Sequence, residues 1–206
     1  MDANVTPEAV REFWFGRPDP LSANIEERID FWFAAGPDVD AEIHQRFGTA
    51  MRNALAGKLD AWQKSPPDCV ALVILLDQFP RNIHRGTREA YSGDEKAYAL
   101  SVYAIDCKAH RALSILERAF LYMPLQHAED GDAQRRSVEV FNALLEESPD
   151  GLRTHIKRFL ASARTHRDII ERFGRFPHRN EILGRECTQE EIEYQRAPAA
   201  PFRSKS

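Results

Sequence analysis

A chain of 206 residues with 43% hydrophobic residues can bury a sizeable core, and it contains no Gly/Ser-rich linker. Its formal net charge of −4 gives no global positive field, which argues against nucleic acid and anionic lipid as partners. We therefore predict one globular domain over residues 1–206, with poorly ordered ends at 1–5 and 197–206.

The cysteines and the start of the chain bear on its compartment. Cys69, Cys107 and Cys187 match neither a disulfide framework nor a CxxC metal site. No basic and apolar leader opens the chain, and no apolar run reaches the roughly 18 residues that span a bilayer. These features predict a cytoplasmic protein without membrane contact. Phosphate-loop, dinucleotide and nucleophile-elbow motifs are also missing, so no cofactor is predicted.

Helix signals recur at short intervals along the chain. Thr6 before Pro7 predicts an N-cap with proline at the first helical position. Capping boxes of the form S/T-x-x-E follow at Ser92/Glu95, Ser114/Glu117 and Thr188/Glu191. Glycines suited to end helices are Gly57 and Gly174. Because no convincing alternating strand pattern occurs, we predict an all-α fold of about eight to ten helices.

Three segments define the expected helix packing. Residues 68–79 are apolar on every side, which predicts a helix surrounded by other helices. Residues 127–147 and 149–173 each carry an apolar stripe at helical spacing. The longer stripe consists of Leu152, Ile156, Phe159, Ala163, His166, Ile170 and Phe173. Packed helix hairpins, bundled or superhelical, are the predicted architecture.

A short echo links two distant parts of the chain. Phe79-Pro80-Arg81-Asn82-Ile83 is similar to Phe176-Pro177-His178-Arg179-Asn180. Each copy follows an apolar helix, and each precedes an adjacent Arg and Gly, Arg85-Gly86 or Gly184-Arg185. Two similar helix-end loops could face each other across a pocket. Chance similarity over five residues is the alternative.

Asp77 occupies an awkward position for a carboxylate. It falls in the last turn of the most apolar predicted helix, where both burial and the helix dipole disfavour its charge. Arg81 and Arg85 in the following loop are the nearby cations, with Arg175 or Arg179 as further candidates. Two interpretations stay open, a structural Asp–Arg clamp and a carboxylate poised in a pocket.

The second copy of the echo is rich in cations. Arg172, Arg175, His178, Arg179 and Arg185 fall within fourteen residues. Large apolar residues interrupt them, which favours guanidinium groups at a partly buried surface that binds carboxylate or phosphate. Pro177 is suited to begin a short helix, whose first amides would add to an anion site. Alternatively, these arginines neutralise acidic residues of the chain itself.

Two histidines are candidates for proton transfer. His166 lies on an apolar helix stripe, so its side chain is expected to point inward. His127, Asp130 and Gln134 share one face at i, i+3 and i+7, and a His–carboxylate pair suits a general base. A buried structural histidine is the alternative for each. The spacing of His and acidic residues matches no known metal motif, so no metal site is predicted.

Four stretches resemble a largely bacterial family known as domain of unknown function 924. They are Phe13-Trp14-Phe15-Gly16, LLDQFPRNIHRGTREAYSGDEKA at 75–97, FLYMPLQHAED at 120–130 and HRDIIERFGRFPHRNEILGRECTQEE at 166–191. The resemblance covers nearly the whole chain and implies an all-α fold of the tetratricopeptide-like superhelix class. It implies no activity. Cys187 stands where the family pattern has Ser, so that hydroxyl is not essential.

Three functional hypotheses follow. The first is a pocket for a small anionic ligand, in which Asp77, His127 and His166 would act in catalysis. The ligand would be bound by Arg81, Asn82, Arg85, Glu129, Arg172, Arg175, His178, Arg179, Asn180 and Arg185. The second is a tetratricopeptide-like module that binds a protein or peptide without catalysis. Nucleic-acid binding, based only on the arginine cluster, is the weakest. The oligomeric state is not predicted.

Overall fold

The computed structural model describes residues 5–16, 25–34 and 36–197, and no strand occurs among them. The predicted all-α fold is therefore confirmed for the described chain. The α-helices are α1 Pro7–Phe15, α2 Ile25–Phe33, α3 Pro37–Leu55, α4 Pro66–Val73, α5 Phe79–Ile83, α6 Asp94–Asp106, α7 Ile115–His127, α8 Gly131–Glu147, α9 Asp150–Phe173, α10 Asn180–Leu183 and α11 Gln189–Arg196. Short 3-10 turns are η1 Asp60–Lys64, η3 Arg88–Tyr91, η4 Ala109–Ala112 and η5 Pro177–Arg179, and Ile74–Gln78 is a π turn. Of the predicted disordered ends, residues 1–4 and 198–206 lie outside the described part.

Most helix-capping predictions are confirmed. The Thr6 hydroxyl accepts a hydrogen bond from the amide of Ala9 at 3.2 Å. Both Ser114 and Thr188 form full capping boxes with the glutamate three residues later. The box predicted at Ser92 is wrong, because Gly93 is the N-cap of α6 and the Ser92 hydroxyl bonds to the carbonyl of Glu89.

The core is built around the apolar segment predicted to be buried. Every residue from Cys69 to Phe79 is at most 8% exposed. Aromatic side chains of other helices pack around it, and Phe79 contacts Phe13, Trp14 and Phe47 edge-on or tilted. Burial of apolar surface, to which these rings contribute, is the main favourable term in the folding of such a chain.

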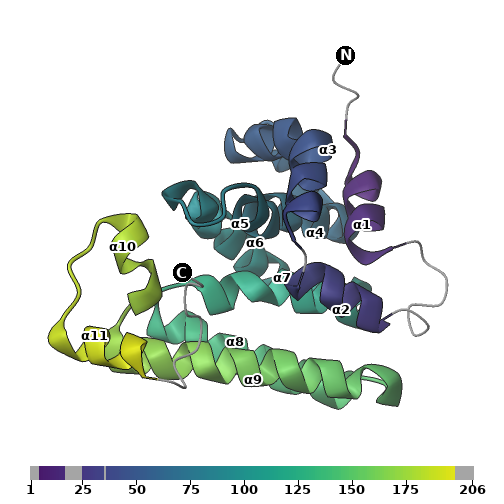
Figure 1. Cartoon of the computed structure of the whole chain (residues 1–206). Helices are drawn as coiled ribbons and strands as arrows, with labels where there is room; N and C mark the ends of the chain where they lie inside the picture. The colour runs from purple at the N-terminus through teal and green to yellow at the C-terminus, as the bar shows by residue number, and fades with distance from the viewer. Residues whose placement is uncertain (1–4, 17–24, 35, 198–206) are drawn as a thin grey trace.

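Helices α7, α8 and α9 pack against one another, with α8 and α9 at the bottom of the view in Figure 1. The long helix α9 lies alongside α8, to which only Ser148 and Pro149 connect it, so the two form a hairpin. The predicted stripe of α9 is confirmed from Ile156 to Ile170, all of whose members are buried. Its last turns belong to a second, smaller apolar cluster of Ile169, Ile170 and Phe176, with Phe173 and Tyr194 packed against it.

A π turn interrupts the buried helix at Ile74–Gln78, where the amide of Phe79 bonds to the carbonyl of Ile74 five residues earlier. Helical backbone then continues through Pro80 to Ile83, so the first echo copy is helix α5 rather than the predicted loop. Pro80 has no N–H to donate to the Leu76 carbonyl. That carbonyl abuts Gly93, where an added Cβ would lie only 2.1 Å from the Leu76 oxygen.

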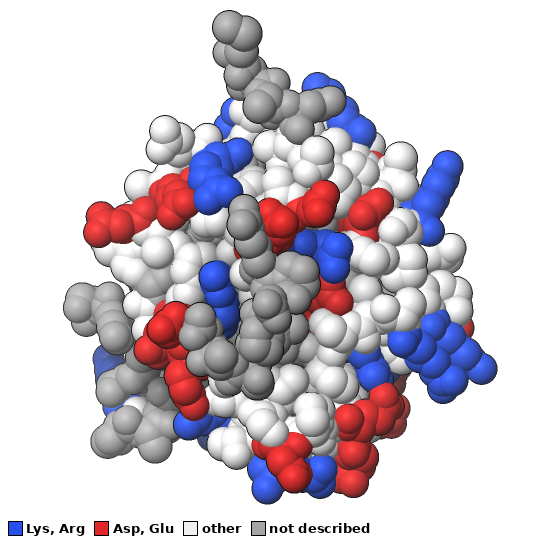
Figure 2. Space-filling model, turned by 90° about the vertical axis from the view of Figure 1, so that its right-hand side faces the viewer, with Lys and Arg blue, Asp and Glu red and all other residues white. Residues whose placement is uncertain are grey.

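Charged side chains of both signs are interspersed over the face of the molecule that Figure 2 shows. Several surface arginines pair with nearby carboxylates, as in Arg136–Asp106 and Arg167–Asp168. Within the described ranges, no helix combines the length and apolar character needed to cross a membrane.

Candidate functional site

A cavity of about 630 Å³ opens between the N-terminal and C-terminal helices. Its walls come from α2, the π turn with α5, η3, α7, α9 and η5. Both copies of the sequence echo reach it, Arg81 and Asn82 from the first and His178 and Arg179 from the second. This volume is in the range of small-molecule sites.

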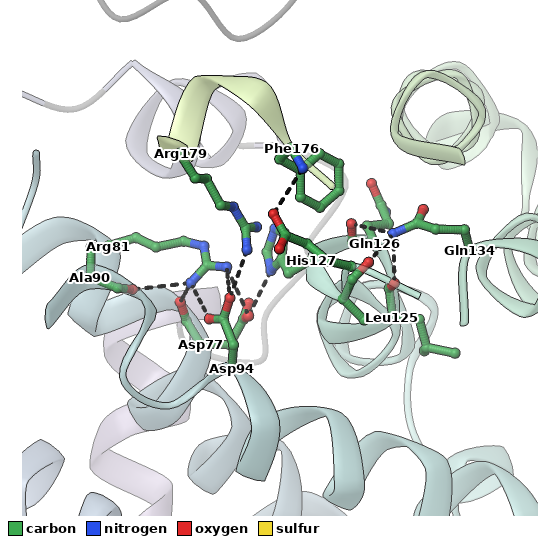
Figure 3. A network of polar contacts seen from close by, with 12 residues as sticks. Asp77, Arg81, Ala90, Asp94, Leu125, Gln126, His127, Gln134, Phe176 and Arg179 are labelled. Carbon is green, nitrogen blue, oxygen red and sulfur yellow. Dashed lines mark hydrogen bonds and ion pairs between the residues drawn. The ribbon is translucent and has the colours of Figure 1, made fainter. Parts of the chain in front are cut away.

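Asp77 lies beneath the floor of this cavity and is fully buried. Its Oδ1 is 2.6 Å from Nδ1 of His127, and its Oδ2 accepts a hydrogen bond from the Gln78 side-chain amide at 2.5 Å. Arg81 lies at 3.7 Å and also bonds to the Asp77 carbonyl (Figure 3). Although burial raises the pKa of Asp77, the interactions of its carboxylate with His127 and Arg81 outweigh this effect, so the pKa of Asp77 lies below its usual range.

His127 ends α7, and its ring forms part of the cavity wall. Burial lowers its pKa, and the positive charge of Arg81 lowers it further, against the opposing pull of Asp77. The imidazole is therefore neutral at pH 7. Because Nδ1 donates its proton to Asp77, Nε2 carries the lone pair and can accept a proton. No hydrogen bond to this Nε2 comes from the described residues.

A second carboxylate, Asp94 at the start of α6, joins the two arginines of the echo. Arg81 binds it with two hydrogen bonds, at 2.7 and 3.1 Å, and Arg179 reaches it at 3.3 Å (Figure 3). The Arg179 guanidinium lies over the rings of Tyr91 and Phe176, 4.6 Å from each centroid. Its side chain is only 8% exposed, and it shares its carboxylate with Arg81, so its charge is incompletely compensated.

Two further histidines lie close to His127. The ring centroid of His166 is 6.1 Å from that of His127, and its Nδ1 bonds to the carbonyl of Ser162 at 2.8 Å. Burial lowers the pKa of His166 to about 3. Burial also lowers the pKa of His178 to about 4, and Arg179 adds to this effect. Both rings are therefore neutral at physiological pH.

The composition of the cavity lining is strongly one-sided. Four arginines and four histidines line it: Arg81, Arg85, Arg158, Arg179, His127, His155, His166 and His178. No Asp or Glu belongs to this described lining. Arg85 pairs with Asp40, whereas Arg158 is exposed and forms no ion pair with a described residue.

Several candidates from the sequence lie outside the cavity. Glu129 binds Arg185 at 2.6 Å and accepts the amide hydrogen bond of Phe176, which fixes the entry to η5. Arg172 pairs with Glu190 and Arg175 with Glu191. Asn180 is buried, and its amide lies 3.4 Å from the Cys187 sulfur. These arginines therefore neutralise acidic residues of the chain itself, which was the alternative to anion binding.

One local interpretation is wrong and another is confirmed only in part. Asp130 is not the partner of His127, because α7 ends at His127 and Asp130 caps α8 by accepting the amide of Ala133 at 2.8 Å. Helical spacing therefore does not apply across residues 127–134. Pro177 does begin a short helical turn, but the amide of Arg179 donates to the carbonyl of Phe176 and is not available to an anion.

Among the residues of the site that the sequence did not indicate are Tyr91, Asp94, His155 and Arg158. A signal existed for the last two. His155, Arg158, Ser162 and His166 follow one another at helical spacing along α9, and all four line the cavity. Tyr91 and Asp94 carry no comparable pattern, since only the fold brings them to Arg81 and Arg179. Among described residues, no group of three His, Cys, Asp or Glu could hold a metal ion.

Comparison with known proteins places this site on a shared fold. A family model of bacterial proteins of unknown function matches residues 10–199. A solved protein of unknown function from Agrobacterium tumefaciens is 39% identical, and the match covers 85% of this chain and 97% of that one with a TM-score of 0.72. Among curated proteins, none matches the chain.

Proposed function

Because the chain belongs to the family of bacterial proteins of unknown function DUF924, whose description names no activity, we propose a function from the cavity itself. The protein binds a small anionic molecule there. The observation that carries this proposal is a lining of four arginines and four histidines without a carboxylate. Such a lining favours anions, since guanidinium groups donate paired hydrogen bonds to carboxylate and phosphate oxygens.

Arg158 and Arg179 distinguish ligand binding from a purely structural clamp. A clamp requires each guanidinium to be satisfied by acidic groups of the chain. Arg158 has no such partner among described residues, and Arg179 only shares Asp94 with Arg81. An anion bound beside either guanidinium group would compensate its charge.

His127 gives the site a group that can move a proton. Asp77 fixes the orientation of its ring and holds the proton on Nδ1, which leaves Nε2 as the acceptor. We propose that Nε2 accepts a proton from the bound molecule or from a water beside it. His166, 6.1 Å away between ring centroids, is the neighbour that would contact the same ligand.

The cellular location and the type of helix arrangement are further parts of the proposal. We propose a cytoplasmic protein with a tetratricopeptide-like arrangement of its helix hairpins and without nucleic-acid partners. Three free cysteines, two of them exposed, and the net charge of −4 support the location and the lack of nucleic acid. The pairing of α8 with α9 supports the hairpin arrangement.

Replacing arginines of the cavity is expected to weaken binding of inorganic phosphate in isothermal titration. Arg179→Ala should raise Kd at least about tenfold, because it removes a charged and buried donor. Arg158→Ala should raise Kd about threefold without affecting folding, because that side chain is exposed and has no ion pair with a described residue. Arg164→Ala, on the same helix as Arg158 but outside the cavity, is the control and should bind phosphate as the wild type does.

Equal Kd values for all four proteins, or no phosphate binding by the wild type at millimolar concentration, would contradict the proposal.

The state of His127 is open to direct measurement. Nitrogen-15 NMR of the imidazole is expected to show the neutral form in excess at pH 6.5, with its hydrogen on Nδ1, because burial and Arg81 lower the pKa of His127. An ordinary histidine is half protonated near that pH, with a pKa of about 6.5. A doubly protonated ring, or a neutral ring with hydrogen on Nε2, would exclude the proposed role.

A further inference from the structure

An apolar wall faces part of the same cavity. Trp32 and Phe33 of α2 contact each other with ring centroids 6.4 Å apart, and Phe33 contacts Phe159 of α9 at 5.7 Å. Ile29 and Met123 also belong to the lining on this side. We call these five residues the apolar wall.

Phe33 is unusual within this wall because it is 58% exposed. Only one other large hydrophobic residue of the described chain, Tyr103, is exposed to a similar degree, and it lies outside this cavity. Exposure of a phenylalanine at the edge of a pocket costs hydration free energy that a bound apolar group would recover.

The apolar wall and the charged residues are separated along the helices that carry them. Phe159 and His166 are seven residues apart on one face of α9, which corresponds to about 10 Å along the axis. Met123 and His127 are four residues apart on α7, or about 6 Å, with the histidine again at the C-terminal end. The cavity therefore has one end lined by Arg179 and the neutral rings of His127 and His166, and another end where the apolar wall lies beside His155 and Arg158.

We propose that the ligand is an amphipathic acid, with an anionic head group at the arginines and histidines and an aliphatic tail along the apolar wall. This inference rests on the proposed anion-binding function and deepens it. Carboxylate and phosphate monoester heads share the required chemistry. A cavity of about 630 Å³ holds such a molecule with a medium-length tail.

Varying the length of the ligand's alkyl chain tests whether the tail binds along the apolar wall. Titration calorimetry with butanoate, hexanoate and octanoate should give a Kd that falls about three- to fourfold for each added methylene, as expected for apolar burial. Octanol, which has the tail without the charge, should bind at least about tenfold more weakly than octanoate. Octyl phosphate compared with octanoate identifies the preferred head group. Equal Kd values for butanoate and octanoate, or for octanol and octanoate, would overturn the proposal.

Variants separate the two ends of the cavity. Phe33→Ser is expected to weaken octanoate binding at least about fivefold while inorganic phosphate binds as before, because only the tail contact is lost. Tyr103→Ser, a similarly exposed aromatic residue outside the cavity, should change neither. If Phe33→Ser leaves octanoate binding unchanged, the tail assignment is wrong although anion binding stands. If wild-type protein binds neither octanoate nor phosphate, the proposed function itself fails.

Discussion

Replacing Asp77 with Ala is expected to lower the free energy of unfolding by about 3 kcal/mol. The substitution removes the acceptor of hydrogen bonds from His127 and Gln78 and leaves a void where a fully buried side chain was. Arg81 would keep only Asp94 as a carboxylate partner. Chemical denaturation monitored by circular dichroism measures the loss. Asp168→Ala is the control, since that carboxylate is 63% exposed on α9 and its removal should change stability by no more than about 0.5 kcal/mol.

Asp77→Asn separates the charge of this carboxylate from its shape. The pKa of Asp77 is lower in the folded protein than in the unfolded chain, where it is about 3.9. Its stabilising contribution is therefore fully present above that pH and is lost as the pH falls through the folded pKa. The variant should show a flatter decline of stability below pH 4 than the wild type. If stability falls with pH equally in the variant and the wild type below pH 4, Asp77 is not held as a carboxylate.

Gly93→Ala is expected to cost about 2 kcal/mol or more in unfolding free energy. The new Cβ would lie 2.1 Å from the carbonyl oxygen of Leu76 and 2.8 Å from its carbon, and both are backbone atoms of the π turn. Relief requires the start of α6 to move away from that turn. Because Asp94 directly follows Gly93, the same movement would pull its carboxylate away from Arg81 and Arg179.

Gly151→Ala provides a matched control for that experiment. Gly151 lies in the first turn of α9, where an added Cβ would have no heavy atom within 4 Å apart from those of its chain neighbours and its own helix backbone. Alanine favours helix over glycine, so this variant should be as stable as the wild type or more stable by up to about 1 kcal/mol. A Gly93→Ala protein with wild-type unfolding free energy would show that α6 and the π turn are not held at this distance.

Local signals in the sequence were sufficient for most of the helices. Thr6, Ser114 and Thr188 are caps because a side-chain oxygen satisfies a backbone amide close in sequence, so no tertiary information is needed. Ser92 matched the same pattern and is not a cap. There, packing against Leu76 requires a residue without a side chain, and Gly93 takes the position instead.

The pairing of Asp77 could be predicted from the sequence, because a buried carboxylate needs a partner. Asp77 within an apolar helix indicates a charge that must be paired, and the structure does pair it. Its partner could not be deduced, because His127 lies fifty residues away and comes from a helix that ends there. The π turn was equally hidden, since a single wider turn leaves no periodic trace in the sequence.

Asp94 shows most clearly what local reasoning cannot reach. It joins Arg81 and Arg179, two arginines that come from the two copies of the echo. Nothing in its neighbourhood distinguishes it from other acidic residues at a helix start, where carboxylates are common. Only the approach of α6 to the π turn makes it the shared acceptor.

The small apolar cluster at the end of α9 implies that two parts of the cavity differ in local stability. His178 and Arg179 belong to the segment held by Ile169, Ile170 and Phe176, whereas Asp77 and His127 are anchored by the main core. A segment with so few buried contacts opens at a lower free energy than the molecule as a whole. One wall can thus detach while the other stays folded. An anion that contacts both parts therefore stabilises the closed state, and its affinity is coupled to the closing of that segment.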